Sequence, residues 1–599
     1  MASISKKKGT FSLKAYRGDA KTLLAFNLDK ASTKNLAGFT IQCEPRGQDA
    51  YYLHNQLQFK TPGDHAQDPK EPANSSINAP IHKFRWIHVP GSVHQGTKPF
   101  LGQYRYTVTP RYFDDKQSLL PLDSKLGAAV LIDVIPFEKG GLALGFTRGF
   151  TQSQAFVNHF GKSALIRPKG RELLFDTSVQ SGMNAQGEKF TFADEYEWLG
   201  FTARQRIFDI LNEVLANTAL RLDMFAYDLN EPDLMNIVLA LAAQGRVRVI
   251  LDNATLHHSA SSPEPEDQFE ALFTKAAKGG AAILRGKFGR YSHDKVFIVS
   301  AAGGPLKVLT GSTNFSVTGL YVNSNHVLVF NDTKIAAVYA AVFEESWSDK
   351  TSKTAFQKST WANNVSKFSG IPKTDITFSP HDPAYVAKVL GDIAARIQVE
   401  DNKAGGNVLF AVMQVDNGTS PVYTALNALH AKETVFSYGI SDSTSGIKLY
   451  APGSKTGVLV TGKPASTVLP PPFNQVPGVG LGHQVHHKFV VCGFNRVGAV
   501  VYCGSSNLAN GGEEENGDNL LAIHDSDVVT AFAIEAVGLV DHFQFLDKYS
   551  AGAKGATKPA ASPTQAAVSA GWFLGTTNAW TRPYFDPKDL HCADRELFA

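Results

Sequence analysis

The most constraining feature of this 599-residue chain is a set of polar residues that occurs twice at the same spacing. Each copy has a His-x-Lys triplet, a Gly-Ser-x-Asn motif whose Asn follows the His by 21 residues, and an amide or acid 11 residues after that Asn. The two sets are His293, Lys295, Ser312, Asn314 and Asn325, and His486, Lys488, Ser505, Asn507 and Asp518. Core packing does not explain polar residues repeated in fixed register. The pattern predicts two half-sites of one site, with two imidazoles and two ammonium groups available to one phosphate.

The spacing also predicts how the motifs come together. Each triplet leads into a short apolar run typical of a β-strand, 296–299 in the first copy and 489–492 in the second. Residues i and i+2 of a strand share a face, so His and Lys should project together. A second β-like run, 306–309 or 499–502, would return Ser and Asn to the triplet. A neutral imidazole can then attack phosphorus, a protonated one can protonate the leaving oxygen, and Lys and Asn can hold the equatorial oxygens.

The two copies resemble the signature of the phospholipase D superfamily, in which His-x-Lys, a variable Asp (the HKD motif) and Gly-Ser-x-Asn occur twice. The resemblance extends over about residues 195–550. The motif Asp, five residues after the Lys, is replaced by Ser300 in the first copy and by Gly493 in the second. The tyrosyl-DNA phosphodiesterase branch also lacks this Asp. That branch has an amide in its first copy and a carboxylate in its second, as do Asn325 and Asp518 here.

The resemblance implies a ping-pong mechanism in which His293 attacks phosphorus and forms a phosphohistidine. Asp518 would orient His293 across the interface between two lobes, because a carboxylate fixes the tautomer of an imidazole and stabilises its cation. His486 would protonate the leaving alcohol and then activate water. The predicted catalytic residues are His293, Lys295, Asn314, His486, Lys488, Asn507 and Asp518, and the predicted substrate-binding residues are Ser312, Ser505, Asn325, Arg290 and Tyr291.

The sequence predicts neither a metal nor a cofactor. Four potential ligands lie close together in the second copy: His483, His486, His487 and Cys492. The two adjacent histidines should point to opposite faces of an extended strand, and no CxxC or HExxH frame is present. His257 and His258 are expected to be a solvated pair in a loop. By the resemblance, phospholipase D-type chemistry also needs no metal.

The order of expected elements divides the chain. Short strands separated by turn residues predict an all-β sandwich over 1–145, which resembles a fibronectin type III or immunoglobulin-like module. From about 195, strand–helix–strand units predict an α/β fold with two pseudo-symmetric phospholipase D-like lobes. The expected parts after the sandwich are a connector (146–194), lobe 1 (195–372), lobe 2 (373–550), and a flexible connector with an aromatic tail (551–599).

Composition and charge limit the surroundings of the protein. The formal net charge of +3 is too small for a strongly polybasic protein. No apolar run of 18 residues predicts a membrane span, and Lys6, Lys7 and Lys8 precede no apolar segment of a signal peptide. The four cysteines are scattered, so reduced thiols are expected rather than a disulfide framework. We expect a cytoplasmic protein, or one exported without a cleaved signal peptide, that acts as a monomer.

The motifs indicate a phosphodiester hydrolase but leave the substrate open. A phospholipid head group, a nucleic acid and a protein–DNA adduct all present the same phosphodiester. A phospholipid is favoured, with peripheral membrane contact, because the loops before the triplets offer aromatic residues and only a modest basic patch, whereas nucleic-acid tracks need more charge. The alternatives are a nuclease or DNA-end phosphodiesterase of the same superfamily, and a non-catalytic protein that captures phosphate.

Overall fold

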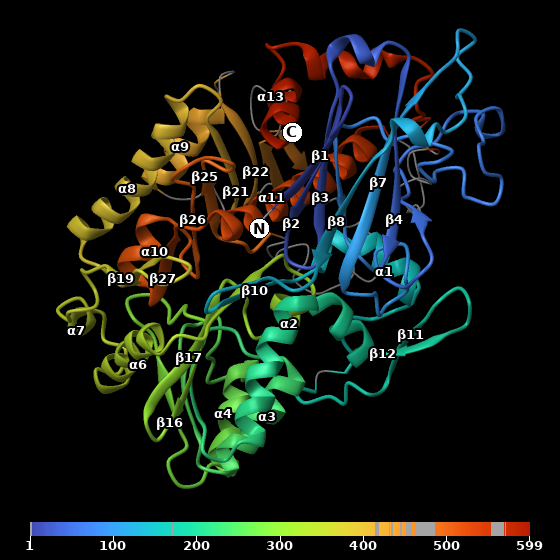
Figure 1. The fold of residues 1–599 in the computed structure, drawn as a ribbon. Helices are drawn as coiled ribbons and strands as arrows, with labels where there is room; N and C mark the ends of the chain where they lie inside the picture. The colour runs from blue at the N-terminus through green and yellow to red at the C-terminus, as the bar shows by residue number, and fades with distance from the viewer. Residues whose placement is uncertain are drawn as a thin grey trace.

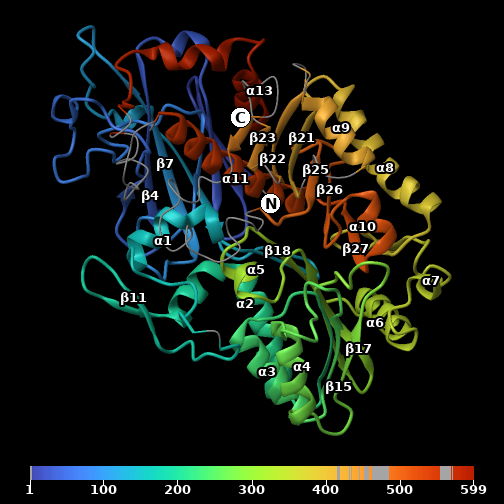
Figure 2. The same ribbon diagram turned by 180° about the vertical axis from the view of Figure 1, so that it is seen from behind.

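The computed structural model describes residues 3–599 apart from 171, 414–418, 431, 433–434, 444–445, 451–457, 462–484, 553–567 and 569–570. The ribbon in Figure 1, seen from behind in Figure 2, shows a β-sandwich packed beside two α/β bodies. Each α/β body has one sheet with helices on its faces, so the predicted α/β class is confirmed.

The N-terminal sandwich consists of two four-stranded antiparallel sheets, with strand orders β1-β2-β3-β6 and β5-β4-β7-β8. Its strands are β1 (Ser3–Lys8), β2 (Phe11–Arg17), β3 (Thr22–Asn27), β4 (Leu36–Pro45), β5 (Tyr51–Tyr52), β6 (Arg85–His88), β7 (Gly102–Tyr112) and β8 (Ala128–Val134). Buried and more accessible residues alternate along β8, as expected for a sheet with one face in a core. Phe26, Phe39 and Tyr106 belong to the core that the two sheets share. The likeness to a fibronectin module stays a prediction.

Lobe 1 is built on an eight-stranded sheet of order β15-β14-β13-β16-β17-β18-β10-β9. Its strands are β9 (Glu138–Lys139), β10 (Leu142–Phe146), β13 (Arg221–Ala226), β14 (Val247–Asp252), β15 (Ala282–Gly286), β16 (Val296–Ala301), β17 (Gly304–Gly311) and β18 (His326–Phe330). Its helices include α2 (Phe192–Ala216), α3 (Pro232–Ala243), α4 (Pro265–Ala276), α5 (Val317–Tyr321) and α6 (Thr333–Ser348). Strands β13, β14 and β15 are parallel, and the triplet and Gly-Ser-x-Asn strands are antiparallel. The predicted strand-and-turn geometry of the first motif copy is therefore present.

Lobe 2 repeats this order in a nine-stranded sheet, β19-β20-β27-β26-β25-β21-β22-β23-β24. Its strands are β19 (Ser366–Phe368), β20 (Thr374–Ser379), β21 (Asn407–Met413), β22 (Phe436–Ser443), β23 (Gly446–Tyr450), β24 (Val458–Thr461), β25 (Phe489–Cys492), β26 (Val500–Gly504) and β27 (Asp518–Ile523). Its helices include α8 (Pro383–Asp401), α9 (Pro421–His430), α10 (Asn510–Glu515) and α11 (Ser526–Gly552). The run β14-β13-β16-β17-β18-β10 corresponds to β22-β21-β25-β26-β27-β20, with the same parallel and antiparallel pairings.

Two expected boundaries differ from the structure. Residues 138–145 fall inside the range expected for the sandwich, but β9 and β10 belong to the lobe 1 sheet, where β10 pairs with β18. The range expected to be a connector, 146–194, holds α1 (Ser153–Phe160) and a hairpin of β11 (Gln180–Met183) and β12 (Lys189–Thr191). Apolar residues of this range, including Phe156 and Phe160, are buried in the core of lobe 1. It is therefore a packed part of the lobe.

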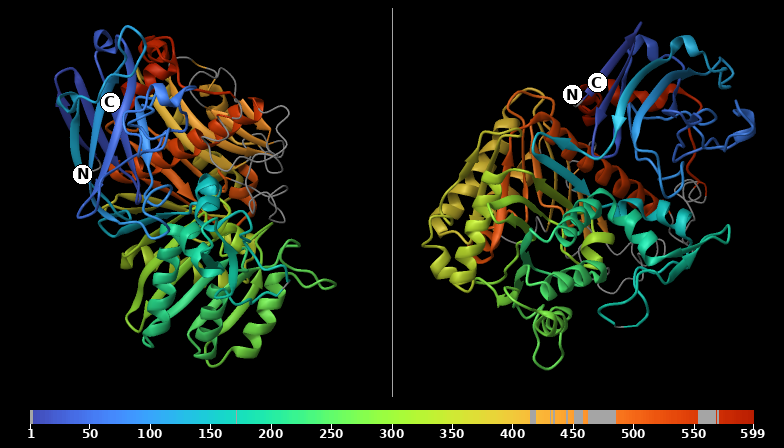
Figure 3. Two further views of the ribbon diagram at one scale, coloured as in Figure 1. Left: turned by 90° about the vertical axis from the view of Figure 1, so that its right-hand side faces the viewer. Right: turned by 60° about the horizontal axis from the view of Figure 1, so that its bottom comes forward.

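The C-terminal tail returns to the sandwich, while most of the expected flexible connector lies outside the described residues. The indole of Trp580 stacks on the imidazole of His82 at 4.9 Å and donates a hydrogen bond to the carbonyl of Leu36. Helix α13 (Leu590–Phe598) packs against β3. Figure 3 shows this tail beside the sandwich and lobe 2.

Helix α11 is the one described helix that is long and apolar enough to cross a membrane by length and composition, over Ser526–Phe545. In the folded chain 72% of this apolar stretch is buried, and α11 packs on β21, β22 and β26 of lobe 2. A core helix of a soluble protein can have the same length and composition, so this helix is weak evidence for a membrane span. The four cysteines are all buried and free, as expected for reduced thiols.

Candidate active site

The two motif copies meet where the lobes touch. Each triplet directly precedes β16 or β25, and each Gly-Ser-x-Asn motif begins at the end of β17 or β26. Two short parallel bridges join the lobes there: Ser292 with Gly517, and Ser324 with Val485. The backbone N–H of His293 donates to the carbonyl of Gly517 at 2.9 Å, and that of His486 donates to Ser324 at 3.1 Å. Each triplet is thus fixed to the acid-or-amide segment of the other lobe.

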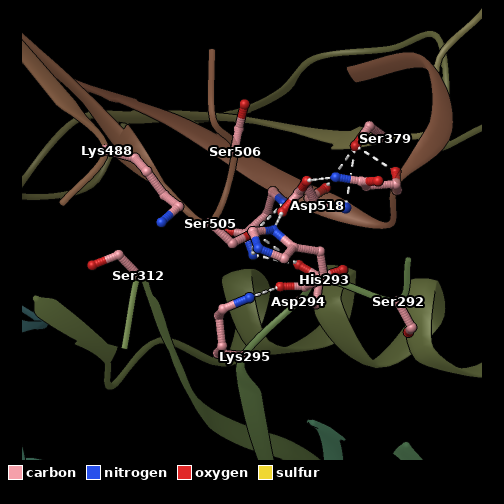
Figure 4. Close-up of polar contacts among 12 residues, drawn as sticks. Ser292, His293, Asp294, Lys295, Ser312, Ser379, Lys488, Ser505, Ser506 and Asp518 are labelled. Atoms are coloured by element: carbon pink, nitrogen blue, oxygen red, sulfur yellow. Dashed lines mark hydrogen bonds and ion pairs between the residues drawn. The ribbon is translucent and has the colours of Figure 1, made fainter. Parts of the chain in front are cut away.

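His293 is held by the carboxylate of the other lobe. Its Nδ1–H donates to Asp518 Oδ1 at 2.7 Å, and both side chains are buried (Figure 4). Burial lowers the pKa of His293 to about 4, in spite of the opposing effect of the Asp518 charge. Burial alone would raise the pKa of Asp518, but His293 and Lys295 outweigh it and keep that pKa below its ordinary value. The hydrogen bond occupies Nδ1, so Nε2 of a neutral His293 carries the lone pair.

His486 is held in the corresponding way by an amide. Its Nδ1–H donates to Asn325 Oδ1 at 2.9 Å and lies 3.0 Å from the carbonyl of Ser312. Asn325 is fully buried, accepts a second hydrogen bond from Ser312 Oγ, and donates through Nδ2 to the carbonyl of Gly319. Asn325 was predicted to bind substrate. Its geometry instead makes it a positioning residue, because both ends of its amide are engaged within the protein.

The two lysines approach the same space from opposite lobes (Figure 4). Lys295 donates to the carbonyl of His293, and Lys488 donates to the carbonyl of His486 at 2.8 Å. Burial lowers the pKa of Lys295 to about 8. Burial and then the charge of Lys295 hold the pKa of Lys488 well below its ordinary value. Two buried ammonium groups that repel each other favour an anion between them, and a phosphate diester supplies one.

The motif asparagines and the motif serines differ in whether their side-chain oxygens have hydrogen-bond partners. Asn314 Oδ1 and Asn507 Oδ1 are buried without a hydrogen-bond partner among the described residues, while Asn314 Nδ2 lies 3.4 Å from Asp228 Oδ2. Ser312 Oγ donates to Asn325 Oδ1 at 2.8 Å, and Ser505 Oγ accepts from the backbone N–H of Asn519 at 3.0 Å. The serines were predicted to bind substrate. Their hydroxyls instead form hydrogen bonds within the protein, to the segments that hold the histidines.

Arg290 and Tyr291, which were predicted to bind substrate, lie just before His293 in the chain, and Arg290 is partly engaged within the protein. Arg290 is exposed, donates through Nε to Asn516 Oδ1 at 3.1 Å, and lies over the ring of Tyr291 at 5.0 Å. The ring of Tyr291 lies 6.5 Å from that of His293. Phe288, an aromatic residue of the loop before the first triplet, is buried and packs on Phe356, so it is not available to a substrate. The second loop, at 469–480, lies outside the described residues.

Two residues outside the motifs, Tyr227 and Asp252, also lie at the site. Tyr227, at the end of β13, places its ring 4.6 Å from the His293 ring, and the Lys295 ammonium lies over it at 4.5 Å. Asp252, the last residue of β14, accepts from the N–H of Ser292 at 2.6 Å and from His257 Nδ1 at 2.9 Å. Both residues follow parallel strands at their carboxyl ends, a general position for functional groups in α/β sheets. That position is the one sequence signal that could have identified them.

His257 corrects the expectation of a solvated pair. It is buried, although its neighbour His258 is exposed. The hydrogen bond to Asp252 and the nearby carboxyls raise the pKa of His257 against the effect of burial. One ligand atom each from Asp228, His257 and Glu266 lies within 4.8 Å of the others, and within the described ranges this is the group that could hold a metal ion.

The comparison with protein families gives a match within lobe 1. Residues 211–347 match the family described as "Cardiolipin synthase, PLD-like domain". The chain is 30% identical over 135 residues to a mitochondrial cardiolipin hydrolase of Xenopus tropicalis, and 27% identical over 136 residues to one of Chlamydomonas reinhardtii. These matches cover 22% of this chain and 57% and 55% of those proteins, so the chain spans little more than half the length of the curated relatives.

A structural neighbour is the phosphatidylserine synthase of Haemophilus influenzae Rd KW20, with a TM-score of 0.37, 11% identity, and coverage of 58% of this chain and 88% of that one. A likeness of this size does not extend to function. The family match supports the resemblance drawn from the motifs over residues 211–347, which are similar to a phospholipase D-like domain and include the first motif copy.

Proposed function

We propose that this protein is a metal-independent phosphodiesterase that works through a phosphohistidine on His293. The observation that carries the proposal is the buried hydrogen bond between His293 Nδ1 and Asp518, which joins the two lobes at 2.7 Å. It leaves Nε2 as the free nitrogen of a histidine that is neutral at pH 7, since its pKa is about 4. The corresponding partner of His486 is uncharged, which supports different roles for the two histidines.

The reaction proceeds in two displacements. His293 Nε2 attacks phosphorus, the P–O bond to the leaving alcohol breaks, and that oxygen takes the proton from His486. His486 then removes a proton from water, the water oxygen attacks phosphorus, and the P–N bond breaks to give a phosphomonoester. Lys295 and Lys488 neutralise the charge on the phosphoryl oxygens, and the Nδ2 groups of the motif asparagines donate to them.

A phospholipid is the proposed substrate class, with a nucleic acid as the alternative. Arg285, part of the expected basic approach, lies 3.4 Å from Asp267 and 3.7 Å from Glu270, so its charge is largely neutralised. This leaves little of the positive track that a long nucleic acid requires. The relatives from Xenopus tropicalis and Chlamydomonas reinhardtii are named for hydrolysis of cardiolipin, which supports a lipid phosphodiester. We also propose a monomer that contacts membranes peripherally from the cytoplasm, or outside the cell after export without a cleaved signal peptide.

A substrate screen tests the proposal. Purified protein in EDTA is incubated with cardiolipin, phosphatidylcholine, phosphatidylethanolamine, single-stranded DNA and bis(p-nitrophenyl) phosphate, each with a primary alcohol present. We expect phosphatidic acid or its analogue from a lipid, and a phosphatidyl-alcohol product from transfer. Turnover of DNA alone would support the nuclease alternative. Stoichiometric binding with no turnover of any substrate would indicate a phosphate-capturing protein instead.

A trapping experiment tests the division of roles. With bis(p-nitrophenyl) phosphate the first displacement needs no acid, because the leaving group is already stable as an anion. The variant His486→Ala should therefore accumulate phosphohistidine, since hydrolysis still lacks its base, and His293→Ala should accumulate none. Peptide mapping that places the phosphoryl group on a residue other than His293 would contradict the assignment.

A further inference from the structure

A cavity of about 830 Å³ lies away from the catalytic motifs, between the sandwich and the lobes. Four segments line most of it: residues 53–58 and 86–94 of the sandwich, the region of α1 at 151–158, and α11 at 535–542. No residue of either triplet or Gly-Ser-x-Asn motif is among its described lining. The volume is in the range of small-molecule sites, about 300–1,000 Å³.

The charged groups of the lining are paired with opposite charges. Lys21 Nζ lies 2.5 Å from a carboxylate oxygen of Glu535, and Lys83 Nζ lies 3.9 Å from Asp541. Asp541 also pairs with Arg85 at 2.7 Å. An anionic or cationic ligand would have to compete with these pairs, two of them in largely buried surroundings. The cavity therefore favours an uncharged ligand.

Uncharged hydrogen-bonding groups dominate the rest of the polar lining. They include the amides of Gln56, Gln58, Gln154 and Asn158. Two lining hydroxyls are already engaged: that of Ser92 donates to Gln152 Oε1, and that of Thr151 to the carbonyl of Arg148. Three buried polar atoms of lining residues have no hydrogen-bond partner among the described residues: His94 Nε2, Gln154 Oε1 and His542 Nε2. Burial holds the pKa of both imidazoles at about 4, so both are neutral at pH 7. A buried polar group without a partner is costly, and a small turn of these side chains toward the cavity would bring them within reach of a ligand's hydroxyls, which both donate and accept.

Aromatic surface completes the lining. Trp86 on β6 is half-buried and lines the cavity. The ring of His94 stacks on that of Tyr51 at 4.2 Å and meets the ring of His54 at 4.5 Å, which makes a rigid group of planar rings. Flat apolar faces next to neutral amides suit a ligand with both C–H faces and hydroxyl edges. A fatty chain would leave the amides without partners.

We propose that this cavity is a second binding site, separate from the phosphodiesterase centre, for a neutral saccharide. The sugar would place C–H faces on Trp86 and the ring group, and hydroxyls on Gln154, His94 and His542. A free oligosaccharide and the head group of a neutral glycolipid present the same chemistry.

Calorimetric titration of the full chain tests the site. The probes are lactose, cellobiose, maltotriose and chitobiose, with sialyllactose as the charged comparison, and phosphatidylcholine vesicles with and without a galactosyl lipid. We expect binding of at least one neutral sugar, and the vesicle arm separates a free from a lipid-borne source. Gln154→Leu should weaken binding about tenfold, the effect of one lost hydrogen bond. Gln103→Leu, at an exposed position on β7 of the same sandwich, should leave it unchanged.

Trp86→Ala should abolish binding and Trp86→Phe should retain part of it. If Trp86→Ala does not fold, Gln154→Leu and Gln103→Leu decide the question. No binding of any neutral sugar in either arm, or binding that Gln154→Leu and Trp86→Phe both leave unchanged, would overturn the proposal. Because the site is separate from the catalytic centre, its failure would leave the proposed phosphodiesterase function untouched.

Discussion

The exchange of Asp518 for asparagine is the sharpest test of the site geometry. Asp518 receives a donor on each oxygen: His293 Nδ1–H at Oδ1, 2.7 Å away, and Asn516 Nδ2 at Oδ2, 3.3 Å away. An asparagine has one oxygen and one NH₂ group, so it can satisfy only one of these donors. Asp518→Asn therefore removes the charge beside His293 and also creates a conflict between two donors.

The two orientations of the new amide set the range of the effect. If its oxygen faces His293, the loss is that of a charge-assisted hydrogen bond, about 1.5–3 kcal/mol, which corresponds to a rate lower by about 10- to 150-fold. If its NH₂ group faces His293, the imidazole must adopt the other tautomer. In an Asp–His pair this change of tautomer lowers the rate by about 10⁴-fold. The hydrogen bond to Asn516 is long, so we expect the first orientation to dominate.

The assay is the burst of p-nitrophenol from bis(p-nitrophenyl) phosphate, which reports formation of the phosphohistidine. Asn325→Ala is the comparison, since Asn325 holds the pseudo-symmetric position next to His486. Asn325→Ala should slow the burst less than Asp518→Asn does, because p-nitrophenolate leaves without the help of an acid. Unfolding in urea checks that both variants are folded. A burst rate that Asp518→Asn leaves unchanged, or that Asn325→Ala lowers more, would refute the assignment of Asp518 to His293.

Three further outcomes are expected. Activity should persist in EDTA, and loss that Mg²⁺, Ca²⁺ or Zn²⁺ restores would point to a metal-dependent mechanism. Mixing His293→Ala with His486→Ala protein should restore no activity, because both half-sites lie on one chain; recovery would mean sites formed between chains. Burial alone would raise the pKa of Glu535, but Lys21 and His487 outweigh it and lower that pKa from 4.5 to about 2. The ionised carboxylate therefore stabilises the folded state. This contribution to the free energy of unfolding is complete above pH 4.5 and is lost as the pH falls through 2. Glu535→Gln should lower the free energy of unfolding by about 3–5 kcal/mol at pH 7 and flatten its dependence on pH in that window; an unchanged urea midpoint would contradict this.

The spacing of the motifs was sufficient to predict which side chains meet. A triplet before one strand and Gly-Ser-x-Asn after the next must lie together when the two strands pair, and β16 with β17 and β25 with β26 do so. Helix α3, which begins at Pro232 and ends at Ala243, lies in one of the strand–helix–strand units expected from about residue 195. These are local consequences of sequence, in which a short turn joins the interacting segments.

Long-range pairing was not readable in the same way. An apolar run such as Leu142–Phe146 has the same pattern in a sandwich as in a lobe, and its partner strand lies more than 180 residues later. The serine hydroxyls bond to residues that follow in the same copy, Ser312 to Asn325 and Ser505 to the backbone of Asn519. The spacing of the motifs brings the serines near the site but does not determine which way their hydroxyls point. His257 was misjudged for a different reason: its partner is local, since its imidazole bonds to Asp252 at the end of β14, and an adjacent pair of histidines does not by itself indicate that only one of them is buried.

The exchange between lobes gives the duplicated sequence its chemical asymmetry. A duplicated half-site alone would give two equivalent histidines, either of which could attack phosphorus. Here each histidine is oriented by a residue of the opposite copy. A single substitution in one copy therefore changes the hydrogen-bond partner of the histidine in the other copy. Asp518 in lobe 2 gives a charged partner to His293 in lobe 1, and Asn325 in lobe 1 gives a neutral one to His486. In the proposed mechanism, a charged partner stabilises the cation that would form when His293 becomes bonded to phosphorus, whereas a neutral partner would let His486 lose its proton more easily. The asymmetry of a single position can therefore separate a nucleophile from an acid in an otherwise symmetric pair.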